Sequence, residues 1–182
     1  MNRLIILTIT FFILSTKLNA QTDFRNGYIV KNNDETIYGL IDYKGNKANS
    51  KKCVFKKDAD SERQEFSPDE IKAYRFLDSK YYISKSIKLE DQETLLFVEY
   101  LINGTVDIFY YRDNLGEHYL LDLGDNELYE LKNEEKEVYV NNTRLIEESK
   151  EYIGILKYSF NQSPTISKKV DNVSLNHKSL IK

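Results

Sequence analysis

The amino-acid sequence predicts a mainly β protein with C-terminal helices, an α+β chain. Its antiparallel hairpins form a sandwich or an open barrel, covered by a C-terminal helix. Short runs rich in tyrosine, phenylalanine, isoleucine and valine recur between residues 27 and 146, and such residues favour strands. After residue 146 the apolar spacing changes to a helical period. With 182 residues, of which 41% are hydrophobic and 30% charged, the chain is long enough for one ordinary domain with a buried core.

The first strands are predicted as two hairpins. Residues 27–31 and 36–43 flank a polar turn at residues 32–35, and residues 52–56 and 63–66 flank an acidic loop. Because side chains alternate along a strand, one face of the second run carries Ile37, Gly39, Ile41 and Tyr43.

A short helical turn is predicted between these hairpins and the next strands. Ser67-Pro68-Asp69-Glu70 combines a cap residue, a proline at the first helical position and a glutamate that completes a capping box. Strands then follow at residues 73–77 and 80–87, and Asp78-Ser79 turns the chain between them.

The segment 95–111 has the strongest hairpin signal. Asn103-Gly104 lies between two apolar runs, and a two-residue turn there pairs Ile102 with Thr105 and Val98 with Phe109. One face then carries Leu96, Val98, Tyr100, Ile102, Phe109 and Tyr111. The other carries Phe97, Leu101, Val106, Ile108 and Tyr110. Since both faces are apolar, we expect a central hairpin covered on both sides by a second sheet or a helix.

Two further hairpins and two helices complete the prediction. Residues 118–123 and 127–132 flank a turn at 124–126, and residues 137–140 and 143–146 flank Asn141-Asn142. Helical spacing then relates Ile153, Leu156 and Phe160, with Tyr152 beside them. Ser163-Pro164 begins a second helix, and the basic end from residue 167 is only weakly amphipathic.

The N-terminus predicts export. Arg3 precedes an uncharged apolar run at residues 4–14, and a polar, cleavable stretch ends at Ala20. The run is too short for an uncleaved membrane anchor, which needs about 20 apolar residues, so no transmembrane span is expected after cleavage. The predicted domains are a signal peptide (1–20), an antiparallel β-rich domain (21–146) and a helical C-terminal segment packed on it (147–182). The expected location is periplasmic, outer-membrane-associated or secreted.

Five segments resemble a group of uncharacterised exported, β-rich proteins from Bacteroidota. They are GYIV (27–30), DETIYGLIDY (34–43), FKK (55–57), SPDEI (67–71) and EYIGILK (151–157). The resemblance implies export and a β-rich fold with a helical tail. It implies no activity and no site residue, because the group has no established activity.

Most signals for chemistry are absent from the sequence. A formal net charge of −3 argues against a nucleic-acid partner. There is no GxGxxG, GxxxxGK[ST] or GxSxG sequence. We therefore assign no catalytic residue, no cofactor and no metal. His118, near Asp122, and His177, in the basic tail, are the two histidines, and we favour a surface or partly buried structural role over catalysis for His118.

Two weak candidates for binding remain. One turn brings together the oxygen ligands that calcium prefers, and we favour a solvated acidic turn there: Asp122, Asp125, Asn126 and Glu127. The basic tail carries Lys168, Lys169, Lys178 and Lys182, which either attract an anionic surface or are only solvated. We favour the second alternative.

The remaining candidate functional residues are the single cysteine and a group of tyrosines. Cys53 is the single cysteine, and a buried strand residue is favoured over a reactive or bridging thiol. A possible binding surface for sugars or peptides comprises Tyr81, Tyr82, Tyr110, Tyr111 and Tyr119. The favoured alternative is that these tyrosines form cross-strand pairs within the sheets.

These observations favour an exported, non-catalytic binding or assembly module of the cell envelope. Its partner is an unidentified envelope protein or a glycan. The alternative is a secreted hydrolase that acts on glycans or peptides through carboxylates not singled out by the sequence. A third alternative is an accessory subunit of a larger envelope complex. A cleft lined by two or more carboxylates with shifted pKa values would favour the enzyme, and an exposed apolar or tyrosine patch would favour the module.

Overall fold

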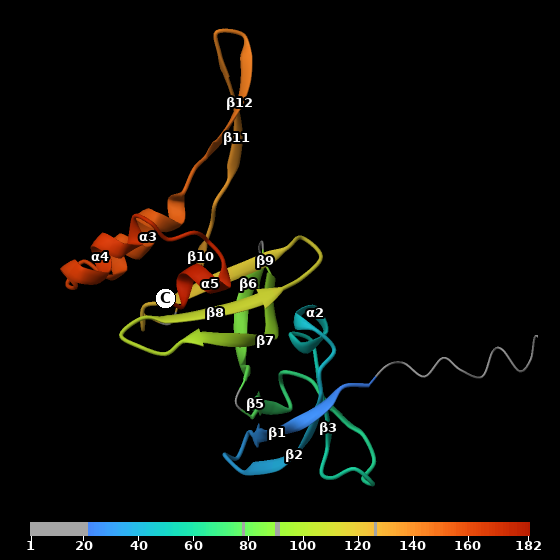
Figure 1. The fold of residues 1–182 in the computed structure, drawn as a ribbon. Coiled ribbons are helices and arrows are strands. Elements are labelled where there is room, and N and C mark those ends of the chain that lie inside the picture. Colours follow the sequence, from blue (N-terminus) through green and yellow to red (C-terminus); the bar gives the residue numbers. More distant parts are fainter. Residues whose placement is uncertain (1–21, 78, 90–91, 126) are drawn as a thin grey trace, which may run out of the picture.

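The computed structural model describes residues 22–182, apart from residues 78, 90, 91 and 126. The predicted signal peptide lies outside the described residues, as does residue 78 of the predicted Asp78-Ser79 turn. The chain is mainly antiparallel β with helices near its C-terminus, as the sequence predicts (Figure 1). No helix in the described part is long and apolar enough to cross a bilayer.

Ten strands form one open antiparallel sheet. They are β1 (Phe24–Lys31), β2 (Thr36–Asp42), β3 (Cys53–Lys56), β4 (Gln64–Phe66), β5 (Ile71–Phe76), β6 (Tyr81–Leu89), β7 (Gln92–Ile102), β8 (Asp107–Arg112), β9 (Glu117–Asp122) and β10 (Leu128–Leu131). The spatial order is β10-β9-β8-β7-β6-β5-β1-β2-β3-β4. All neighbours are consecutive in sequence except β5 and β1. Two meanders, β1–β4 and β5–β10, are therefore joined along the β1–β5 pairing.

The first cluster of buried residues, here called the aromatic core, lies against β1–β3 and β5–β7. It consists of Ile29, Ile41, Cys53, Phe55, Ile71, Tyr74, Phe76, Tyr82 and Phe97. The Tyr74 ring stacks on Tyr82 at 4.8 Å and meets Phe97 edge-on at 5.0 Å. Cys53 is a buried strand residue, and burial raises the pKa of its thiol.

A short helix that the sequence analysis missed, α2 (Asn46–Asn49), covers part of the aromatic core. The Tyr74 hydroxyl donates to the carbonyl oxygen of Asn49 at 2.6 Å. The N–H of Phe97 donates to the carbonyl oxygen of Ser50 at 2.9 Å. These bonds hold the end of α2 and the residue after it against β5 and β7, although they are distant in sequence.

The β1–β2 hairpin forms as predicted, with Gly27 directly opposite Gly39. A Cβ on Gly27 would lie 2.4 Å from the carbonyl oxygen of Arg75, and one on Gly39 would lie 2.3 Å from that of Lys56. Neither distance is possible between non-bonded atoms, and both obstacles are backbone. Gly27 therefore allows β1 to approach β5 closely at the join between the meanders, and Gly39 allows β2 to approach β3.

The predicted register of the central hairpin is wrong. Tyr100, rather than Val98, pairs with Phe109, and Ile102 pairs with Ile108 after an irregularity. The turn is longer than two residues, and the Asp107 carboxylate accepts from the N–H of Gly104 at 3.2 Å within it. Because the strand period is two, a shift of two residues keeps Val98 and Phe109 on one face as predicted.

The predicted helical turn at residues 67–70 is a hydrogen-bonded turn instead of a helix. The N–H of Glu70 donates to the carbonyl oxygen of Ser67 at 3.1 Å. The Ser67 hydroxyl and N–H both donate to the Glu70 carboxylate, at 2.6 and 2.7 Å. The capping contact therefore forms, but the strand β5 begins at Ile71, before a helix can continue.

Three helices follow the strands: α3 (Glu151–Ser159), α4 (Pro164–Val170) and α5 (His177–Leu180). They contribute to the second cluster, here called the helix-covered core. Its buried members are Val106, Ile108, Tyr110, Tyr119, Leu121, Leu131, Tyr152, Leu156 and Val170. Ile153 and Phe160 pack against it, so the predicted helix covers one apolar face of the central hairpin. The opposite face forms a third cluster that includes Val98, Phe109 and Leu120.

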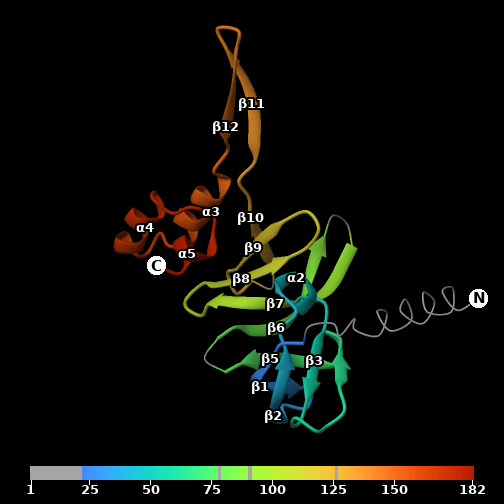
Figure 2. The ribbon, with the colours of Figure 1, turned by 45° about the vertical axis from the view of Figure 1, so that its right-hand side comes forward.

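A separate two-stranded sheet, β11 (Glu135–Val140) and β12 (Thr143–Glu148), projects from the main sheet on the side away from β1 and β2 (Figures 1 and 2). We call this hairpin the arm. Asn141 and Asn142 both adopt positive φ, 50° and 60°, as a tight primed turn requires. The turn forms where the sequence predicts it, and β12 continues two residues beyond the expected end at residue 146.

Candidate functional site

The tyrosines of the possible binding surface are mostly inside the protein. Tyr82, Tyr110, Tyr111 and Tyr119 are at most 2% exposed, and Tyr81 is half-buried. Four of the five therefore do not form an exposed platform, because the helices and the curved sheet cover both faces of the central hairpin. Tyr110 and Tyr119 instead make a cross-strand pair with ring centres 5.3 Å apart.

Three of these tyrosines, Tyr82, Tyr110 and Tyr119, lie close to a buried polar network centred on Glu99. Glu99 is only 6% exposed, and its carboxylate contacts Lys80 Nζ at 2.5 Å and His177 Nε2 at 3.7 Å. His177 Nδ1 lies 3.1 Å from the Tyr119 hydroxyl. The His177 ring also meets Tyr110 edge-on at 4.2 Å. The network therefore attaches α5 to β7, β8 and β9.

The electrostatics of this network indicate a structural role. Burial raises the pKa of Glu99, but the nearby His177 and the hydrogen-bonded Lys80 outweigh it, so the pKa is lowered and the carboxylate stays ionised. Burial also raises the pKa of Tyr110 and of Tyr119, which keeps both phenols neutral. A permanently ionised carboxylate that is already paired is a poor general acid. The sequence signal for the network was a single acidic residue inside the apolar run LLFVEYLI.

His118, a weak catalytic candidate, lies between two carboxylates. Its Nδ1 is 2.7 Å from Glu130 and its Nε2 is 3.0 Å from Asp113, while its ring stacks on Tyr111. Burial lowers the pKa of His118, but the two carboxylates outweigh it and the net shift is upward. Both ring nitrogens are thus engaged, and the arrangement stabilises the charged imidazolium rather than a free base.

The acidic turn considered for calcium has its carboxylates occupied by protein donors. Asp122 accepts from Lys85 Nζ at 2.8 Å and from the N–H of Gly124 at 2.9 Å. Asp125 accepts from the Tyr129 hydroxyl at 2.7 Å. Asn126 lies outside the described residues. Within the described part, no group of three or more histidine, cysteine or acidic side chains is placed to hold a metal ion.

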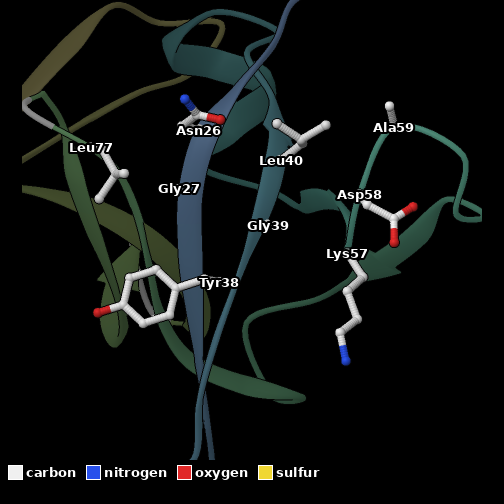
Figure 3. Close-up of a pocket in the computed structure, with 9 residues that line it drawn as sticks. All are labelled: Asn26, Gly27, Tyr38, Gly39, Leu40, Lys57, Asp58, Ala59 and Leu77. Atoms are coloured by element: carbon white, nitrogen blue, oxygen red, sulfur yellow. The ribbon is translucent and has the colours of Figure 1, made fainter.

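A shallow hollow lies over the β1–β2 pair. Figure 3 shows Tyr38 extending to one side of the strands, while Lys57 and Asp58 lie on the other side, in the segment after β3. The Asp58 carboxylate accepts three hydrogen bonds from Asp60 and Ser61 in its own loop. The Asp58 carboxylate is therefore occupied within its own loop and does not point a free polar group into the hollow, so we assign no site there.

The arm presents the clearest interaction surface. Every residue of β12 and all but Val138 of β11 are exposed. Large apolar side chains are exposed on it to between 46% and 70%: Tyr139, Val140, Leu145 and Ile146. From the strand register, Val138, Val140 and Leu145 share one face, while Tyr139 and Ile146 share the other. Both faces of the arm are thus partly apolar.

The base of the arm is held to the rest of the chain. The N–H of Ser149 donates to the carbonyl oxygen of Glu134 at 2.8 Å, and the N–H of Lys150 donates to the Asn133 amide oxygen at 3.1 Å. Lys150 adopts a left-handed φ of 50° at the start of α3, which redirects the chain into the helix. The arm therefore leaves the protein in a defined direction.

Comparisons with known proteins identified no relative of this chain. No family model, no curated protein and no solved structure matches the chain. The functional argument therefore rests on the residues and their geometry.

Proposed function

We propose that this protein is an exported, non-catalytic binding or assembly module of the cell envelope, and that the arm is its contact with a protein partner. The observation that carries the proposal is the projecting two-stranded sheet with exposed apolar side chains on both faces. An isolated two-stranded hairpin is only marginally stable in water, so a partner surface would stabilise it considerably.

The backbone of the arm supports the same proposal. β11 and β12 pair only with each other, so each has one outer edge with free N–H and C=O groups. Such an edge pairs readily with a strand of another protein, which supplies main-chain hydrogen bonds while alternate side chains enter pockets. The apolar residues near the tip would fill those pockets.

The charges of the arm indicate the character of the partner. Its base carries three glutamates, Glu135, Glu147 and Glu148, and one lysine, Lys136, opposite Glu147; near the tip Arg144 is ion-paired with Glu137. The partner surface that fits best is therefore a strand edge beside an apolar patch, with basic residues around it. Charge complementarity of this kind fixes the orientation and accelerates association.

The hydrolase alternative receives less support from the geometry. It needs two carboxylates that face one cleft at a set separation. The large cavity beneath the C-terminal helices is lined by neither aspartate nor glutamate. Glu99, the most buried glutamate described, is paired with Lys80.

The arm can be tested by site-specific photo-crosslinking in the native envelope. A photo-reactive residue placed at Leu145 should give one adduct of defined mass. The matched control is Leu115, which is 87% exposed in the β8–β9 turn, and it should give none. Replacing Tyr139 and Ile146 with serine should abolish the adduct at position 145. Equal adducts from both positions, or none from position 145, would refute the arm as the contact.

Export can be tested independently. Cleavage after Ala20 leaves a mature protein that begins at Gln21, and the intact mass of the native protein would reveal this directly. A native protein that retains Met1 to Ala20 would contradict export by a cleaved signal peptide.

A further inference from the structure

A large cavity lies beneath the C-terminal helices, away from the arm. Its volume is about 920 Å³, near the upper end of the roughly 300–1,000 Å³ typical of small-molecule sites. It lies between the β7–β8 turn, α3, α4 and the residues of and after α5. The chain segments around it are distant in sequence, so the cavity exists only when the helices pack on the sheet.

The interior of the cavity is apolar. Buried members of the helix-covered core border the cavity and are at most 4% exposed: Val106, Ile108, Leu156 and Val170. The apolar surface that faces the space comes from half-buried side chains around them: Ile102, Leu123, Phe160, Val173 and Leu180. A hydrocarbon chain placed here would leave water for an already formed apolar surface, which is favourable at about 0.8 kcal/mol per CH₂ group.

The charged residues of the lining are of one sign. Lys169 and Lys182 line the cavity, together with neither aspartate nor glutamate, in a chain that has 29 acidic residues. Asp171, directly after α4, is ion-paired with Lys157. No ion pair joins Lys169 to a carboxylate within the described part of the chain. Lys169 therefore places a positive charge beside the apolar lining without an ion pair to a side-chain carboxylate in the described part of the chain.

We propose that this cavity binds a fatty acid anion, with the hydrocarbon tail against Ile102, Leu123, Phe160 and Leu180 and the carboxylate beside Lys169. An apolar interior with a lysine at its boundary matches the two parts of this ligand. A neutral lipid would leave the lysine without a partner, and a small hydrophilic anion would leave the apolar walls uncovered. The proposal does not rest on the function proposed for the arm.

Binding can be measured by titration calorimetry of the exported protein with dodecanoate below its micelle concentration. We expect one site. Acetate, which has the head without the tail, should not bind. Dodecyltrimethylammonium, which has the tail with the opposite charge, should bind about tenfold or more weakly, because it places like charges together. Absence of dodecanoate binding, or equal binding of the cationic amphiphile, would overturn the proposal.

Two adjacent lysines provide a matched pair of variants. Lys169 lines the cavity and Lys168 does not, although both are exposed residues in the last turn of α4. Lys169→Glu should raise the Kd for dodecanoate by about tenfold, since one ion pair is replaced by a repulsion. Lys168→Glu should leave it within about twofold, because only long-range, screened charge changes. Equal effects of the two changes would mean that Lys169 is not the carboxylate partner.

The location of the ligand can be tested separately, because the chain contains no tryptophan. Thr105→Trp places a fluorophore at an exposed position in the cavity lining, and Leu115→Trp places one in the distant β8–β9 turn. A brominated fatty acid should quench the fluorescence of the first variant and leave the second unchanged. Quenching of both variants alike would show adsorption elsewhere on the surface and overturn the assignment of the cavity. Thermal melting of both variants confirms that each is folded.

Discussion

The aromatic core and the helix-covered core lie on one sheet, yet they are packed differently. Five of the nine buried residues in the aromatic core carry aromatic rings, and strands supply all nine. Six of the nine buried residues in the helix-covered core are aliphatic, and α3 and α4 supply three of the nine. The cavity beneath the C-terminal helices borders this second core.

The difference follows from how each covering element is held. Hydrogen bonds between neighbouring strands fix the strand positions, so rigid aromatic side chains can pack closely between them. Short helices such as α3 and α4 are held mainly by side-chain packing, since isolated helices of this length are unstable. A space of ligand size therefore persists where the helices meet the sheet, and the aromatic core provides the rigid support.

The largest loss of stability is expected in the aromatic core. Phe97→Ala should lower the free energy of unfolding by about 3–5 kcal/mol, because the buried ring leaves a cavity that fixed strands cannot fill. Leu95→Ala on the same strand, at 42% exposure, is the control and should cost less than about 1 kcal/mol. Urea unfolding measures both, and equal losses would contradict the dense packing around Phe97.

The polar network between the two cores should contribute the next largest effect. Lys80→Met leaves the buried Glu99 carboxylate without its closest cation, and we expect a loss of about 3 kcal/mol. Glu99→Gln should cost less, because Lys80 is 25% exposed and can turn toward water. The double variant should recover much of the loss of Lys80→Met. Simple additivity in urea unfolding would show that the two residues are not coupled.

A smaller loss is expected in the helix-covered core. Leu156→Ala removes buried methyl groups and should cost about 2–3 kcal/mol, at the lower end for such changes, because the neighbouring cavity gives side chains room to relax. An unchanged urea midpoint would mean that α3 is not part of the core in solution.

A pH-dependent contribution near neutral pH is expected from His118, which lies on β9 and stacks on Tyr111 of the third cluster. The pKa of His118 is raised in the folded protein, so its stabilisation is complete below the unfolded pKa of about 6.5. It is lost as the pH rises through the folded pKa. The urea midpoint should therefore fall between pH 6 and pH 9, and His118→Gln should remove that part of the fall. An unaltered pH dependence in the variant would contradict the contribution of His118.

The smallest effect on stability is expected in the arm. Leu145→Ser and Ile146→Ser should change the free energy of unfolding by less than about 0.5 kcal/mol, because both side chains are already exposed. The same variants should weaken the partner contact. A large loss of stability in the isolated protein would mean that the arm packs against the rest of the chain.

The sequence correctly predicted the elements that neighbouring residues specify. The turn residues at 32–35 and 141–142 predicted the β1–β2 hairpin and the arm, and Ser163-Pro164 predicted the start of α4. The helix α2 was missed because Asn46–Asn49 has no apolar period. The register of the central hairpin was wrong because the side chain of Asp107, outside the Asn103-Gly104 pair, shapes its turn.

The candidate sites were less predictable than the fold, because burial depends on contacts between distant segments. Tyr110 and Tyr119 are hidden only because α5 packs over them through His177. Lys169 was recognised as part of a basic tail, but its position at an apolar cavity depends on the packing of α4 with α3. Conversely, the exposure of Leu145 depends on the arm having no neighbour, which no local pattern reports.

The pairing of β1 with β5 has a consequence for the order in which the protein folds. Each meander contains only pairings between consecutive strands, so both can form from contacts close in sequence, which form fastest. The β1–β5 pairing joins residues as far apart as Gly27 and Phe76. Closing that loop has an entropic cost, which the β1–β5 hydrogen bonds and the packing of Ile29 with Tyr74 in the aromatic core offset. The junction between the meanders, where Gly27 allows β1 to approach β5 closely, is thus where we expect the folding transition state to be decided. Side chains added there would slow folding as well as weaken the folded state.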